Sequence, residues 1–183
     1  TKSDFGGKDG ETSYSDKVTR SEFLESFRER LIFLKDVLAE EGCVYVHLDQ
    51  KMSHYVKVVM DEIFGKDRFI NEIIWYYENG GGRGRDWFNR KHDNILLYSK
   101  SKNFFYDGLA VGEKRNIDEG SFGGYFKTDE DGKRYQEVRA GGKIYKYYVD
   151  DPKNPDDVWN VPIISQRDKT ERTQYPTQKP EAL

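Results

Sequence analysis

The sequence contains a single cysteine, Cys43, among its 183 residues. A lone cysteine cannot form an internal disulfide, and its position in an apolar run predicts a buried structural thiol. Cys43 and the three histidines, His47, His54 and His92, have none of the spacings of metal ligands. We therefore expect no metal site.

Long apolar runs are also missing. No stretch approaches the roughly 18 apolar residues that a membrane-spanning helix needs, and the polar, glycine-rich start predicts no signal peptide. These features predict a cytoplasmic protein with no membrane partner. The sequence also lacks a glycine-rich dinucleotide fingerprint and a Walker loop, and it indicates no Ser/His/Asp triad.

An excess of positive charge is absent too. The 30 Lys and Arg residues are outnumbered by 33 Asp and Glu, which gives a net charge of −3. Any contact with nucleic acid must therefore come from a local basic patch. The aromatic content of 15% argues against disorder, and the length suits one domain or slightly more.

Helices and strands are predicted from Thr19 onward, after a loop over residues 1–18. Thr19 and Glu22 fit a capping box for a helix with an apolar face, and Gly42 is expected to end it. A β-rich run then predicts a strand covered on both faces, and Gly65 should end a second helix. This alternation predicts an α/β fold. The predicted strands are residues 43–48, 69–77 and 94–98, and the second predicted helix is residues 53–64.

A basic linker joins the second and third predicted strands. Between Asn79 and Lys102 six residues are basic and two are acidic. Three consecutive glycines make the linker flexible, and Trp87 and Phe88 lie among its arginines. This composition suits a surface for phosphates and bases. A flexible, solvated hairpin loop explains the same residues, and the sequence leaves both readings open.

Residues 104–158 differ in composition. Hairpin turns are predicted at Asp131-Gly132 and Gly141-Gly142, between tyrosine-rich arms. The segment has too few aliphatic residues for a core of its own, so we expect a small β-rich insertion. Residues 158–164 then predict an apolar segment that returns to the core.

Two places could hold a ligand. Asp49 ends a predicted strand, where open α/β sheets bind ligands, although it could simply cap the next helix. Near the chain end, Pro180 suits a first helical position. Backbone N–H groups there, with Thr177 and Lys179, would favour a carboxylate or phosphate. A surface loop leading into a helix is the alternative.

Several segments in order resemble motifs of the DNA amino-methyltransferases, the family that methylates adenine N6 or cytosine N4. The order matches the β-type arrangement of restriction-modification enzymes. Each segment alone is weak, whereas their order and spacing together are specific. The segments are residues 38–49, 58–65, 69–75, 90–100 and 157–164, followed by 175–180.

The resemblance implies a partial Rossmann-like methyltransferase sheet, its C-terminal half, with strands 69–77 and 94–98 as an antiparallel hairpin. It divides the chain into a loop start at 1–18, a partial α/β core at 19–103, a target-recognition insertion at 104–158 and a return segment at 159–183. The return segment would carry the cofactor-pocket motif.

The resemblance also implies S-adenosylmethionine as cofactor and double-stranded DNA as partner, with a flipped adenine accepting the methyl group on N6. Part of the cofactor pocket would be lined by Thr177, Gln178, Lys179, Pro180 and Asp49. DNA phosphates would be held by Arg83, Arg85, Arg90 and Lys91, and the insertion would read base edges.

Two motifs of the family are missing from the sequence. These are the catalytic Asp-Pro-Pro-Tyr and the Phe-x-Gly-x-Gly cofactor loop. We therefore expect a fragment with no catalytic residue of its own, an incomplete cofactor pocket and no activity alone. An open edge at strand 43–48 predicts a homo-oligomer, and a restriction subunit is a further expected partner.

Two other functions fit the same residues. The chain could be a non-catalytic DNA-binding or specificity module that uses the basic linker and the insertion. It could also be a structural α/β domain with no nucleic-acid role, which its net negative charge favours.

Overall fold

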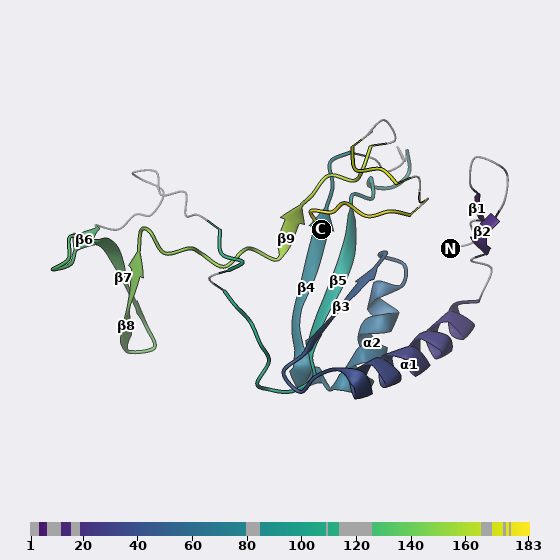
Figure 1. Cartoon of the computed structure of the whole chain (residues 1–183), viewed down its shortest axis with the longest axis horizontal. Helices are drawn as coiled ribbons and strands as arrows, with labels where there is room; N and C mark the ends of the chain where they lie inside the picture. The colour runs from purple at the N-terminus through teal and green to yellow at the C-terminus, as the bar shows by residue number, and fades with distance from the viewer. Residues whose placement is uncertain are drawn as a thin grey trace. The chain divides into compact units, whose positions relative to one another are not determined.

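The computed structural model has a mixed α/β fold (Figure 1). It describes residues 4–6, 12–15, 19–79, 85–108, 110–113, 126–165, 170–173, 175 and 177–183, the first two ranges as backbone only. The chain divides into two compact units. The first comprises residues 1–105 and 157–183, and the second residues 106–156.

A four-stranded sheet organises the first unit. Its strand order is β3-β5-β4-β9; β3 and β4 run antiparallel to β5, and β9 runs parallel to β4. The predicted α/β order and the antiparallel hairpin are confirmed. The elements are α1 (Arg20–Val37), β3 (Cys43–Leu48), α2 (Ser53–Phe64), η1 (Lys66–Arg68), β4 (Phe69–Tyr76), β5 (His92–Ser99) and β9 (Val158–Asn160).

Helix α1 starts as predicted and ends earlier. The Thr19 side chain accepts from the N–H of Glu22, whose carboxylate accepts from the N–H of Thr19 at 2.8 Å. The helix ends at Val37, because Leu38 is already extended. The prediction that Gly42 ends the helix is wrong. Gly42 closes a separate turn onto Ala39, where a Cβ would lie 2.8 Å from the Leu38 side chain.

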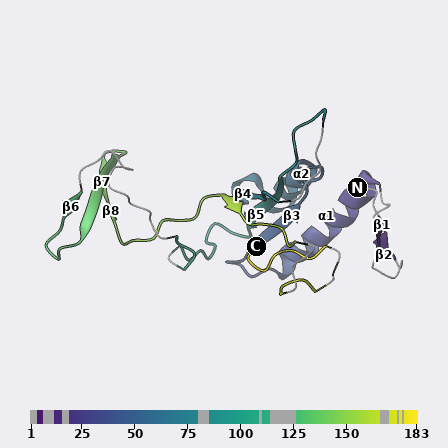
Figure 2. The same ribbon diagram turned by 90° about the horizontal axis from the view of Figure 1, so that it is seen from above.

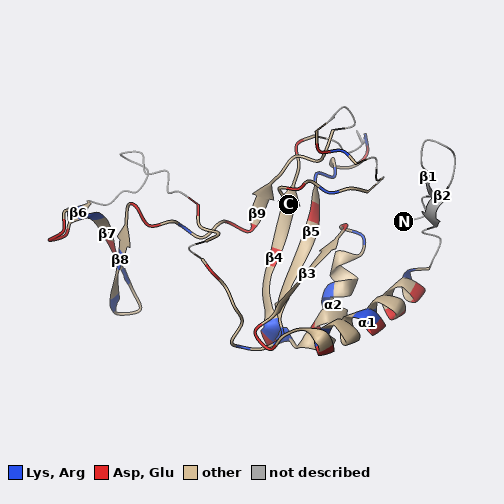
Figure 3. Ribbon diagram, viewed as in Figure 1, with Lys and Arg blue, Asp and Glu red and all other residues tan. Residues whose placement is uncertain are grey.

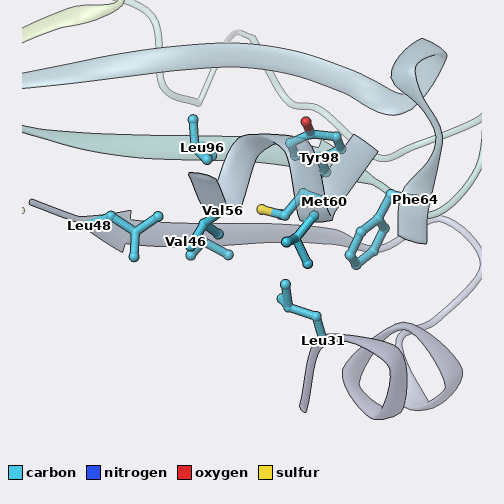
Figure 4. Close-up of a cluster of buried hydrophobic side chains, with 9 residues drawn as sticks. Leu31, Val46, Leu48, Val56, Met60, Phe64, Leu96 and Tyr98 are labelled. Atoms are coloured by element: carbon cyan, nitrogen blue, oxygen red, sulfur yellow. The ribbon is translucent and has the colours of Figure 1, made fainter. Parts of the chain in front are cut away.

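One face of the sheet packs against both helices. The hydrophobic pattern of α2 places Val56 and Met60 fully inside, opposite Leu96 and Tyr98 of β5. Figure 4 shows these side chains converging with Leu31 of α1. We call this set the helix-side core; its buried members are Leu31, Val46, Leu48, Val56, Val59, Met60, Phe64, Leu96 and Tyr98.

The prediction that strand 43–48 is covered on both faces is wrong. Val46 and Leu48 are buried, but Tyr45, which precedes Val46, is 57% exposed. Sequence patterns count tyrosine among apolar residues, which concealed the alternation. In the described part of the chain, β3 pairs with β5 alone and lies at the sheet edge.

The opposite face of the sheet has a second, smaller core. Ile73, Trp75 and Ile95 are buried there. The return segment covers them, with Trp159, Val161, Ile163 and Leu183 as partly buried neighbours. Figures 1 and 2 both show the C-terminus beside β4 and β5. The predicted return of residues 158–164 to the core is confirmed.

The second unit has a three-stranded antiparallel sheet of β6 (Lys127–Thr128), β7 (Arg134–Ala140) and β8 (Lys143–Tyr148). Both predicted turns are present. Gly132, Gly141 and Gly142 have φ values of 80°, 59° and 75°, a conformation that favours glycine. The unit extends over nearly the same residues as the predicted insertion.

Two short strands lie within residues 1–18, where the sequence predicts a loop. Instead of a loop only, β1 (Asp4–Gly6) and β2 (Thr12–Ser15) form an antiparallel pair with Phe5 opposite Tyr14. Sequence reading missed these strands because each is very short. Within the described residues, no helix has the length and apolar character needed to cross a membrane.

Candidate functional site

A polar cluster lies on the face of the sheet opposite the helices. His47 of β3 and Asp93 of β5 approach with Nε2 and Oδ2 3.0 Å apart, and both side chains are largely buried. Tyr77, just beyond β4, directs its hydroxyl to Asp93 Oδ1 at 3.5 Å. Three neighbouring strands thus bring a histidine, a carboxylate and a phenol together.

Trp75 connects this cluster to the end of the chain. Its ring contacts the rings of His47 and Tyr77, at centroid distances of 5.4 Å and 5.3 Å. Its indole N–H donates to the carbonyl of Val161 at 2.7 Å, and the ammonium of Lys179 lies 5.8 Å from its ring centroid. The buried indole therefore holds the return segment against the sheet.

The surroundings of Tyr77 disfavour its anionic form. Burial, followed by the negative charge of Asp93, raises the pKa of the Tyr77 hydroxyl above its ordinary value, and Asp49 adds to this effect. Tyr77 therefore remains a neutral hydrogen-bond donor at physiological pH.

Asp49 contributes to the turn before α2. Its Oδ1 accepts from the N–H groups of Lys51 and Met52, both at 3.1 Å. These bonds lie in the turn, whereas α2 itself has Met52 as its N-cap and no side-chain cap, so the alternative that Asp49 caps this helix is wrong. A ligand role for Asp49 remains a prediction.

Gln178 ties the end of the chain to the preceding loop. Its Oε1 accepts from the N–H and the hydroxyl of Thr173 at 2.7 Å and 2.9 Å, and its Nε2 donates to the carbonyl of Glu171 at 2.8 Å. Glu171 in turn accepts from the N–H of Glu181. Gln178 therefore stabilises the conformation of the C-terminal segment through hydrogen bonds inside that segment.

The neighbouring residues of the predicted pocket differ in exposure. Pro180 is buried, Thr177 is half-buried and Lys179 is exposed. Residues 180–183 form one hydrogen-bonded turn, with the N–H of Leu183 donating to the carbonyl of Pro180 at 3.1 Å. Thr177 and Lys179 are thus the members best placed to meet a ligand. Their cofactor role remains a prediction.

The basic linker between β4 and β5 is held at its two ends. Asn79 exchanges two hydrogen bonds with Ile163, at 2.8 Å and 3.0 Å. The ammonium of Lys91 donates to the carbonyl of Glu78 at 2.8 Å and so ties the second end of the linker to the first. Arg85 and Arg90 are exposed. Arg83 lies outside the described residues.

Aromatic side chains accompany these arginines. Trp87 is 62% exposed and Phe88 is 97% exposed. A phenyl ring so fully in water makes little contribution to the fold. Exposed rings next to cations are the composition of nucleic-acid surfaces, so the linker retains its predicted DNA-binding role as a proposal.

Sequence reading missed the pairing of His47 with Asp93. The sequence pattern gave neither residue a role in a site. The available signal was a charged residue within the apolar strand His92–Ser99. Among the described residues, no group of three or more His, Cys, Asp or Glu side chains could hold a metal ion.

Comparison with known proteins decides the family. Residues 3–183 match the model of the DNA methylase family whose members act at N6 or N4 amino groups. The chain belongs to this N6/N4 DNA methylase family. The family prediction made from ordered motifs is confirmed.

Individual relatives are restriction-modification methyltransferases. The chain is 35% identical over 103 residues to the type II methyltransferase M.EcaI of Enterobacter cloacae, covering 56% of this chain and 23% of that protein. It is 28% identical over 180 residues to the type II methyltransferase M.HpaI of Haemophilus parainfluenzae, covering 97% of this chain and 47% of that protein.

A third relative belongs to a type III system. The chain is 31% identical over 144 residues to the probable type III restriction-modification enzyme HindVI Mod subunit of Haemophilus influenzae, covering 77% of this chain and 17% of that protein. The chain thus spans less than half the length of each of these relatives.

Proposed function

We propose that this chain forms part of a site-specific DNA methyltransferase that transfers a methyl group from S-adenosylmethionine to adenine N6. The family match over nearly the whole chain is the observation that carries the proposal. In this proposal the four-stranded sheet is part of a larger Rossmann-like sheet. Residues 106–156 act as the target-recognition insertion.

The residues beside Trp75 suit part of a cofactor site. S-adenosylmethionine carries a carboxylate, and the ammonium of the exposed Lys179, 5.8 Å from the ring centroid of the buried Trp75, offers a matching charge. Thr177 adds a hydroxyl. Gln178 and Pro180 support the segment through its internal hydrogen bonds and burial. S-adenosylmethionine would supply the electrophilic methyl group, while these residues bind and orient it.

The chain alone should not catalyse methyl transfer, because its sequence contains neither the Asp-Pro-Pro-Tyr motif nor the Phe-x-Gly-x-Gly motif. Turnover on adenine-containing duplex by the purified chain would overturn this statement. A Mod-type partnership with a restriction subunit follows by analogy from the type III relatives. Pairing of two chains through the edge of β3 is a further part of the proposal, which sedimentation as a monomer would contradict.

Binding measurements test the proposed function. The chain should bind fluorescent duplex DNA, with the affinity decreasing as salt increases. Arg85→Ala and Arg90→Ala should each reduce the salt slope by about 1. The matched control is Arg30→Ala, an exposed arginine on α1, which should leave the slope unchanged. Absence of duplex binding by the native chain would overturn the proposed function for this part of the enzyme.

Cofactor binding is tested separately by calorimetry with S-adenosylmethionine. If the chain binds it, Lys179→Ala should weaken binding about tenfold, as expected for loss of one charged hydrogen bond. Lys153→Ala, in the other unit, provides the control. Duplex binding without any cofactor binding would instead favour the non-catalytic specificity module.

A further inference from the structure

The β7–β8 hairpin, residues 134–148, is a basic element in an acidic neighbourhood. It carries four basic side chains and one acidic one. The described residues on either side of it, 126–133 and 149–156, carry three basic and six acidic side chains. Figure 3 shows red at the β6–β7 turn and blue along the hairpin. This separation of charge favours an anionic partner at the hairpin alone.

One face of the hairpin is occupied by its own contacts. Tyr135 is 8% exposed and packs against Tyr148 at a centroid distance of 5.6 Å. The ammonium of Lys146 lies 4.7 Å from the Tyr135 ring centroid. Glu137, the single acidic residue, pairs with Lys127 at 2.5 Å. The negative charge is therefore neutralised on this face.

The other face and the tip are exposed. Val138 and Tyr145 lie opposite each other and are 40% and 44% exposed. Lys143 directly follows the tight turn at Gly141-Gly142 on this face, whereas Arg139, close to the turn, pairs with Ile144 on the first face; both cations are exposed. The unit does not need this exposed apolar pair or these two cations for its own packing.

We propose that this hairpin enters the major groove of duplex DNA tip first, with the Val138–Tyr145 face against the groove wall. The inference rests on the proposed function and identifies the contacting element within the insertion. The major groove admits a two-stranded β-ribbon, and its phosphates match the cationic tip. A protein partner would fit less well, since lysine is depleted at the centres of protein interfaces.

The two tip cations have different roles in this arrangement. The planar guanidinium of Arg139 suits a bidentate contact with a guanine edge. The ammonium of Lys143 suits a phosphate, as a compact point charge. Arg139 is then a specificity-determining residue and Lys143 an affinity residue.

Salt-dependent binding to a random-sequence duplex pool tests the phosphate contact. Lys143→Ala should weaken binding and reduce the salt slope by about 1. Lys133→Ala changes the same residue type just outside the hairpin and should alter neither quantity. Near-ultraviolet circular dichroism should show the Tyr135–Tyr148 pair unchanged in both variants.

Selection from a randomised duplex pool tests the base contact. The native chain should enrich a motif, and Arg139→Ala should lose the preference at one position while retaining the others. If hairpin variants leave affinity, slope and motif unchanged while Arg85→Ala weakens binding, the hairpin inference is wrong and the proposed function stands. If the native chain binds no duplex, both fail. If the variants change self-association and not DNA binding, the hairpin is a protein contact and the inference is wrong.

Discussion

The two faces of the four-stranded sheet differ in chemistry as well as in covering. The face toward α1 and α2 is packed with aliphatic side chains and the ring of Tyr98. The opposite face carries His47, Asp93 and Trp75, and the return segment covers it instead of a helix. The helix-side face is thus largely apolar, whereas the opposite face also encloses polar side chains that pair with each other.

The largest expected effect comes from the helix-side core. Leu96→Ala removes a side chain that is 1% exposed and should lower the free energy of unfolding by about 2–5 kcal/mol, through lost burial and a cavity. Urea denaturation followed by circular dichroism measures it. Leu34→Ala, at a residue 47% exposed on α1, should change stability by less than about 1 kcal/mol. Equal losses of unfolding free energy in the two variants would contradict the assignment of Leu96 to the core and Leu34 to the surface.

A smaller effect is expected on the opposite face. Trp75→Phe deletes the indole N–H that donates to Val161 and should cost about 1–3 kcal/mol, because a partly buried carbonyl loses its partner. The return segment should also loosen, so trypsin should cleave after Arg172 faster than in the native chain. Trp87→Phe, at an exposed position, is the control. An unchanged cleavage rate would show that Trp75 does not hold the segment.

The smallest expected effect concerns Tyr98 on the helix side of the sheet and depends on pH. Tyr98 donates to Asp61 at 2.7 Å, so Tyr98→Phe should cost about 1 kcal/mol at neutral pH. Burial, with Asp61 as acceptor, raises the pKa of Tyr98 far above its ordinary value.

The sign of the pH effect follows from that shift. The stability that the neutral Tyr98 hydroxyl contributes is complete below the unfolded-state pKa of about 10 and is lost as pH rises above it. Urea denaturation at pH 8 and pH 11 should therefore show a smaller alkaline loss for Tyr98→Phe than for the native chain. Tyr106→Phe, at an exposed tyrosine, should lose as much as the native chain. Equal losses in all three proteins would contradict the assignment.

Local signals predicted most elements well. The capping box at Thr19, the run of residues 43–48, the stop at Gly65 and the turn at Gly141-Gly142 depend on neighbours within a few positions, and the structure has each of them. The end of α1 was misplaced, because several residues separate Val37 from the expected stop and none of them breaks a helix strongly. The covering of β3 was misjudged because tyrosine suits either a core or a surface.

The candidate site was harder to predict, since its members come from distant positions. His47 and Asp93 are 46 residues apart in sequence, and Trp75 meets Val161 across 86 residues. Such pairs depend on strand order and register, which no short pattern encodes. The motif around Lys179 was found only through its family resemblance.

The sequence by itself determined the family and most of the helices and strands, because ordered motifs and local propensities lie along the chain. Only the tertiary structure placed β5 between β3 and β4, and this strand order brings His47 and Asp93 within 3.0 Å. It also determined which side chains of the C-terminal segment are engaged internally and which, like that of Lys179, are exposed. Burial and hydrogen bonding are decided by what the fold places beside a residue, so they could not be read from the chain alone.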